Sequence, residues 1–93
     1  MASVFISQPM RGLSKDQIKA ERQRIKATLD HDDMVINCSI AYDGEHQLWH
    51  LGRALQDLDI ADKAIFSKDW QTARSCIIEH MACEMYGVPI VEV

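Results

Sequence analysis

Four short apolar segments alternate with three longer segments that have helical periodicity. The apolar segments cover residues 4–6, 34–38, 63–67 and 88–93, and the helical segments cover 14–29, 47–57 and 72–86. Short continuous apolar runs are typical of strands buried on both faces, and strands that alternate with helices form parallel sheets. The order predicts an α/β fold: a three-layer Rossmann-like or flavodoxin-like domain with a four-stranded parallel sheet in the order 2-1-3-4.

The first helix has a clear beginning and a clear inward face. Ser14 and Gln17 have the spacing of a capping box, which predicts that the helix starts directly after Ser14. Ile18, Ile25 and Leu29 share one face with the stem of Arg22, and the opposite face is charged.

In the other two helices, the apolar positions predict which face packs against the sheet. In the second helix, four leucines are expected to point inward: Leu48, Leu51, Leu55 and Leu58. In the third, one arc is expected to face the sheet: Ile77, Ile78, Met81, Ala82 and Met85. The opposite arc holds Cys76, Glu79, Cys83 and Tyr86, which is unusually apolar for a solvent face. We therefore expect a subunit interface beside Glu79, and a homo-oligomer. Gly87 is placed to end this helix.

Length and charge limit the classes of partner. A chain of 93 residues is enough for a single domain over residues 1–93, and its net charge of −4 argues against a nucleic-acid partner. It contains no run of about 18 apolar residues, so no membrane-spanning helix is expected. Three cysteines without framework spacing, and an N-terminus without a signal peptide, predict a cytoplasmic protein.

A ligand site is expected where the predicted strand order reverses direction. The loops that follow strands 1 and 3, residues 7–13 and 67–72, flank this point. Arg11 and Gly12, beside a capped helix N-terminus, could hold an anion, although a surface arginine and a turn glycine would give the same pattern. Trp70 could stack on a ligand. Neither a P-loop nor a G-x-G-x-x-G fingerprint is present.

The third helix also carries residues with the spacing of a metal site. Cys76, His80 and Cys83 have the spacing of helical metal ligands. Isolated cysteines more often behave as small hydrophobic residues, so we expect no metal and no cofactor.

Two motifs resemble a known family. VFISQPMRGLS is similar to the opening strand and loop of nucleoside 2-deoxyribosyltransferase-like proteins, and ADKAIFSKDW with ARSCIIEHMACEMYGVPI is similar to their second signature. The nearest subgroup comprises short phage-associated and bacterial proteins of unknown function. The resemblance covers most of the chain and is weakest over residues 30–47.

This resemblance implies a nucleoside or nucleotide N-glycosidase or 2-deoxyribosyltransferase. Glu79 would be the nucleophile that attacks the anomeric carbon and forms a glycosyl-enzyme intermediate. Arg11 and Gly12 would contact a phosphate. Ser7, Gln8 and Met10 would line the sugar and base pocket.

The chain departs from the family pattern at two positions. Ala54 and Ala73 stand where active relatives usually carry acidic residues, which removes the expected proton donor for the leaving base. Two other hypotheses therefore remain: a non-catalytic nucleotide-binding protein that senses or sequesters its ligand, and a structural or interaction protein that retains only the fold.

Overall fold

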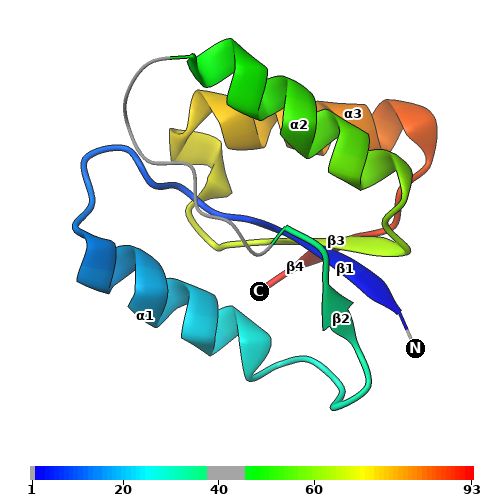
Figure 1. Ribbon diagram of the computed structural model, residues 1–93, viewed down its shortest axis with the longest axis horizontal. Coiled ribbons are helices and arrows are strands. Elements are labelled where there is room, and N and C mark those ends of the chain that lie inside the picture. The colour runs from blue at the N-terminus through cyan, green and yellow to red at the C-terminus, as the bar shows by residue number, and fades with distance from the viewer. Residues whose placement is uncertain (1, 38–45) are drawn as a thin grey trace.

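The computed structural model describes residues 2–37 and 46–93. A four-stranded parallel sheet has the order β2-β1-β3-β4, so the predicted fold class is confirmed (Figure 1). The strands are β1 (Ser3–Ser7), β2 (Met34–Val35), β3 (Lys63–Phe66) and β4 (Ile90–Glu92). The helices are α1 (Lys15–Lys26), α2 (Gln47–Asp59) and α3 (Arg74–Tyr86), with a 3₁₀ turn, η1 (Trp70–Thr72), before α3.

Helices cover both faces of the sheet, with α1 on one face and α2 and α3 on the other (Figure 1). Alternate residues of a strand point to opposite faces, and the core divides accordingly. Under α1 the buried cluster is Val4, Ile6, Ile25 and Ile65. Under α2 and α3 it is Phe5, Leu58, Ala64, Phe66 and Cys83.

The start of α1 is the predicted capping box. The Ser14 hydroxyl accepts a hydrogen bond from the Gln17 backbone N–H at 3.1 Å, and the Gln17 side chain accepts one from the Ser14 N–H at 2.8 Å. Ile18, Arg22 and Ile25 are buried, which confirms the predicted inward face.

Strand β2 is shorter than predicted because a side chain replaces its backbone pairing. Asn37 accepts a hydrogen bond from the Ile6 N–H at 2.9 Å and donates one to the Ile6 carbonyl at 2.7 Å. These two bonds satisfy the β1 backbone at a position where a regular strand would otherwise continue. Cys38 and the expected loop 39–45 lie outside the described residues. Strand β4 is also shorter than the expected 88–93.

The predicted orientation of α3 is wrong. Cys76, Glu79 and Cys83 face the sheet and are buried. The arc that was expected to be buried is largely exposed: Ile77 40%, Ile78 42%, Met81 54% and Met85 76%. Both arcs are apolar, so hydrophobicity could not distinguish them. The smaller cysteine side chains occupy the sheet contact, and Glu79 gains a hydrogen-bond partner there.

The inward face of α2 is only partly as predicted. Leu58 is buried and Leu51 is half-buried, whereas Leu48 is 82% exposed and Leu55 is 36% exposed. Across residues 2–37 and 46–93, none of the helices has the length and apolar character needed to cross a membrane.

Candidate functional site

The carboxyl ends of β1 and β3 lie side by side where the strand order reverses. The Ser67 N–H donates a hydrogen bond to the Ser7 carbonyl at 2.9 Å, and both serines are buried. Chain connections leave this point in opposite directions, toward α1 on one face and toward η1 and α3 on the other. The structure therefore brings together the two loops that the sequence identified.

Glu79 is the buried acidic group at this position. Its carboxylate oxygen Oε1 accepts a hydrogen bond from the Ser7 hydroxyl at 2.7 Å, and its exposed fraction is only 7%. The two residues are 72 positions apart in the chain. The contact therefore depends on α3 packing against the end of β1, and it fixes where the carboxyl group points.

Burial changes the acidity of this cluster. Removal from water raises the pKa of Glu79 to about 7, and the hydrogen bond from Ser7 opposes part of that rise. Burial likewise raises the pKa of Cys76 and of Cys83 to about 11. The two thiols therefore stay protonated at neutral pH and are poor nucleophiles, whereas Glu79 can gain or lose its proton near neutrality.

The loop after β1 is anchored to α1. Gln8 donates a hydrogen bond to the Ile18 carbonyl at 3.1 Å and accepts one from Arg22 at 2.9 Å. Beyond it, the Leu13 N–H bonds to the Met10 carbonyl at 3.1 Å and closes a turn. Gly12 has a φ of 79° in this turn, a conformation that glycine adopts without strain. Gln8 is therefore buried and links the loop to α1, and its side chain is not exposed to solvent.

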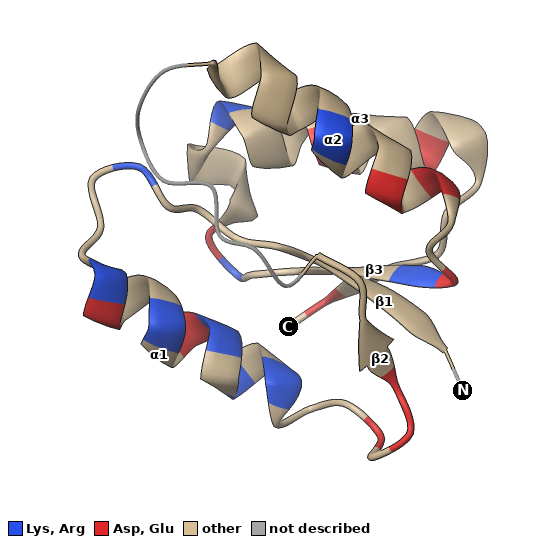
Figure 2. Ribbon diagram, viewed as in Figure 1, with Lys and Arg blue, Asp and Glu red and all other residues tan. Residues whose placement is uncertain are grey.

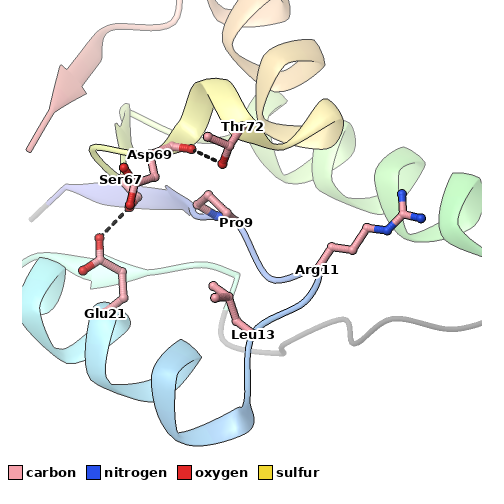
Figure 3. A pocket seen from close by; sticks show the side chains of 7 residues that line it. All are labelled: Pro9, Arg11, Leu13, Glu21, Ser67, Asp69 and Thr72. Atoms are coloured by element: carbon pink, nitrogen blue, oxygen red, sulfur yellow. Dashed lines mark hydrogen bonds between the residues drawn. The ribbon is translucent and has the colours of Figure 1, made fainter.

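A cavity of about 310 Å³ lies between this loop, α1 and η1 (Figure 3). This volume is at the lower end of the range for small-molecule sites. Arg11 is the one basic residue among the described lining residues, and its guanidinium group points away from the other lining side chains (Figure 3). The lining consists of Pro9, Arg11, Leu13, Glu21, Ser67, Asp69 and Thr72.

Glu21 is held as a carboxylate at the cavity wall. Both of its oxygens accept hydrogen bonds from Arg24, at 2.7 and 2.8 Å, and one oxygen also accepts the Ser67 hydroxyl. The hydrogen bonds from Arg24 are the main reason that its pKa falls to about 2, despite an opposing effect of partial burial. With Asp69, the cavity carries two acidic residues.

Trp70 lies outside this cavity lining. Its ring stacks on His80, with 3.8 Å between ring centroids and 2° between planes, and its indole N–H donates to Glu92 at 3.0 Å. His80 also contacts Glu84 at 3.0 Å. Trp70 therefore joins η1 to α3 and β4. One face of its ring is covered by His80, so that face is not available to stack on a ligand.

The residues considered as metal ligands do not converge on α3. Cys76 and Cys83 face the sheet, whereas the His80 nitrogens lie near Glu84 and Glu92. Within the described ranges, the acidic side chains that come together are Asp30, Asp32 and Asp33, in the turn after α1. Asp33 there bonds to Lys63 and to the Asp30 N–H, so we assign no metal to this turn.

Apart from Trp70, the predicted site residues occupy three different settings. Arg11 lines the cavity, with Met10 and Gly12 as its neighbours in the turn. Ser7 and Glu79 form the buried pair, and Gln8 anchors the loop. Sequence reasoning missed Glu21, which lies three residues after Ile18 and four before Ile25, so helical spacing could have placed it near the inward face. It also missed Pro9, Leu13, Ser67, Asp69 and Thr72, all of which belong to the two loops already identified.

Two observations define the candidate site: a buried carboxyl group bonded to Ser7, and an adjacent loop-lined cavity with two acidic residues. The family resemblance of the two sequence motifs has no independent support. Comparison of the chain with protein-family models, with curated proteins and with solved structures found no match.

Proposed function

We propose that this protein cleaves or transfers the N-glycosidic bond of a nucleoside or nucleotide, with Glu79 as the nucleophile. The observation that carries the proposal is the buried hydrogen bond between Ser7 and Glu79 at the carboxyl end of β1. A carboxyl group held at a switch point, with its pKa raised to about 7, is a typical candidate for a catalytic role.

The proposed chemistry has two steps. An oxygen of the ionised Glu79 carboxylate bonds to the anomeric carbon while the bond to the base breaks, and the base leaves with the electron pair and takes up a proton from water. Water or a second base then attacks the same carbon, gives up a proton to the solvent and releases the carboxylate. Ser7 holds Oε1 by its hydrogen bond, which would leave the other oxygen to form the ester.

The adjacent cavity favours an uncharged ligand. The Asp69 carboxylate can accept hydrogen bonds from sugar hydroxyls but repels a phosphate, whereas the charge of Glu21 is already balanced by its hydrogen bonds from Arg24. The guanidinium group of Arg11, which was expected to bind an anion, points away from these groups (Figure 3). A nucleoside therefore suits the cavity better than its 5′-monophosphate.

Release of free base from a panel of nucleosides and nucleotides tests this function. We expect turnover by the unaltered protein and a loss of at least about 100-fold in Glu79→Gln, which preserves shape but cannot form the ester. Glu84→Gln is the matched control, because Glu84 is an exposed carboxylate on the same helix. Failure to release base from any substrate would disprove the enzymatic function.

A non-catalytic nucleotide-binding protein is the second candidate. It is favoured by one observation, that Glu79 is not among the residues that line the cavity. Ala54 and Ala73 also provide no acid for the leaving base. Calorimetric binding with the ligand recovered intact would identify this function, whereas turnover would exclude it. A homo-oligomer and a cytoplasmic location stay predictions from the sequence. The subunit interface expected beside Glu79 is wrong, because Cys76, Glu79 and Cys83 are buried against the sheet within the chain.

A further inference from the structure

A buried arginine on α1 contacts both the loop after β1 and the chain after β2. Arg22 is only 5% exposed. One of its guanidinium nitrogens donates a hydrogen bond to the Gln8 side chain at 2.9 Å, and another donates to the Asn37 carbonyl. A guanidinium group presents its N–H donors in a rigid planar fork, so it can hold two acceptors in a fixed relative position.

These two contacts reach the residues on both sides of Ser7. Gln8 follows Ser7 directly in the chain. Ile6 precedes Ser7, and the Asn37 side chain accepts a hydrogen bond from the Ile6 N–H and donates one to the Ile6 carbonyl. Arg22 therefore restrains one neighbour of Ser7 directly and the other neighbour through Asn37.

Ser7 itself points to the opposite face of the sheet. Successive residues of a strand alternate between the two faces, and the neighbours Ile6 and Gln8 contact α1. The Ser7 hydroxyl donates its hydrogen bond to Glu79 of α3, and α1 and α3 cover opposite faces of the sheet (Figure 1). A restraint that begins on α1 thus reaches Glu79 across the sheet, through the backbone of a single residue.

We propose that Arg22 is a positioning residue for Glu79. By fixing the backbone on both sides of Ser7, it directs the Ser7 hydroxyl toward Oε1 and so sets where the carboxyl group points. Arg22 acts through this restraint and not through its charge, because the sheet lies between the two side chains. The consequence for catalysis rests on the proposed function, whereas the restraint itself does not.

An NMR titration of the Glu79 carboxyl carbon tests the positioning role. The Ser7 hydrogen bond lowers the pKa of Glu79, so losing this bond should raise the pKa above its value of about 7. We expect a rise of about one pH unit in Ser7→Ala and at least about half of that in Arg22→Gln. Lys19→Gln removes the same charge from an exposed position on α1, so it is the matched control and should leave the pKa unchanged.

A double variant distinguishes positioning from a direct effect of charge. In Ser7→Ala there is no hydroxyl to direct, so adding Arg22→Gln should raise the pKa of Glu79 no further. An equal rise with and without the hydroxyl would mean that Arg22 acts by its charge, and it would overturn the proposal. Gln8→Met removes one contact but keeps the guanidinium charge, and it replaces Arg22→Gln in the test if that variant does not fold. A pKa that neither variant changes would also overturn the proposal.

Steady-state kinetics connects the positioning role to the proposed reaction. Arg22→Gln should lower kcat for a nucleoside about tenfold with little change in KM, because a misdirected carboxyl group affects the reaction more than the binding. The two proposals can fail separately. Absence of turnover in the unaltered protein would disprove the glycosidic function but leave the titration valid. Normal values of both kcat and the Glu79 pKa in Arg22→Gln would overturn the positioning role alone.

Discussion

The carboxyl group of Glu79 lies on the face of α3 that contacts the sheet, and removal from water raises its pKa to about 7. An acid whose pKa is raised in the folded state holds its proton more tightly there than in the unfolded chain. The resulting stabilisation is fully present below the ordinary pKa of 4.5 and is lost as the pH rises to about 7. Glu21 acts in the opposite sense. Its pKa is lowered to about 2, so its contribution is present above pH 4.5 and is lost as the pH falls below that value.

Replacing Glu79 with Gln should therefore remove part of the pH dependence of stability. We expect the unaltered protein to lose about 2–3 kcal/mol from this residue between pH 4.5 and 8, whereas Glu79→Gln keeps a neutral partner for Ser7 at every pH. Urea unfolding of both proteins at several pH values measures how the free energy of unfolding of each depends on pH. Parallel stability curves for the two proteins would show that burial does not penalise the charged carboxylate.

The Asp69 carboxylate at the cavity predicts a preference between ligands. A nucleoside should bind about tenfold more tightly than its 5′-monophosphate, because Asp69 repels the phosphate. Asp69→Asn should reduce this difference in affinity, and Asp59→Asn, on α2, should leave the difference unchanged. Calorimetry with one matched pair of ligands is sufficient. Tighter binding of the monophosphate would mean that Arg11 turns into the cavity and dominates the recognition.

At the scale of the elements, α1 was the most predictable helix because its signals are local. Ser14 and Gln17 are three residues apart, so their reciprocal hydrogen bonds depend only on the backbone between them. The orientation of α3 could not be predicted in this way. The partner of Glu79 is Ser7, 72 residues earlier in the chain, and both arcs of the helix are apolar. The short β2 has a similar cause, since Asn37 bonds across to Ile6 on another strand.

The capping box of α1 should contribute measurably to stability. Ser14→Ala removes the acceptor for the Gln17 N–H and should lower the free energy of unfolding by about 1 kcal/mol. Ser14→Asp retains an acceptor at the same position and should lower the free energy of unfolding much less. Chemical denaturation of the three proteins distinguishes the outcomes. Equal losses in both variants would mean that the serine acts through some other contact.

At the scale of the whole molecule, the alternation of strands and helices was enough to predict the sheet order and the position of the switch point. The cavity follows from that topology, since its lining comes largely from the loops after β1 and β3. Its acidic character was not predicted. The two carboxylates lie on α1 and in the loop after β3, and only the folded chain brings them to one cavity.

Mass spectrometry of a trapped intermediate tests the central claim, that Glu79 accepts a glycosyl group. A nucleoside with fluorine at C2′ destabilises the positively charged transition states and slows hydrolysis of the ester, so the adduct accumulates. We predict an added mass equal to the fluorinated sugar, located on the peptide that contains Glu79 and absent in Glu79→Gln. Recovery of unmodified protein with intact nucleoside, or an adduct on another residue, would contradict the assignment of Glu79 as the nucleophile.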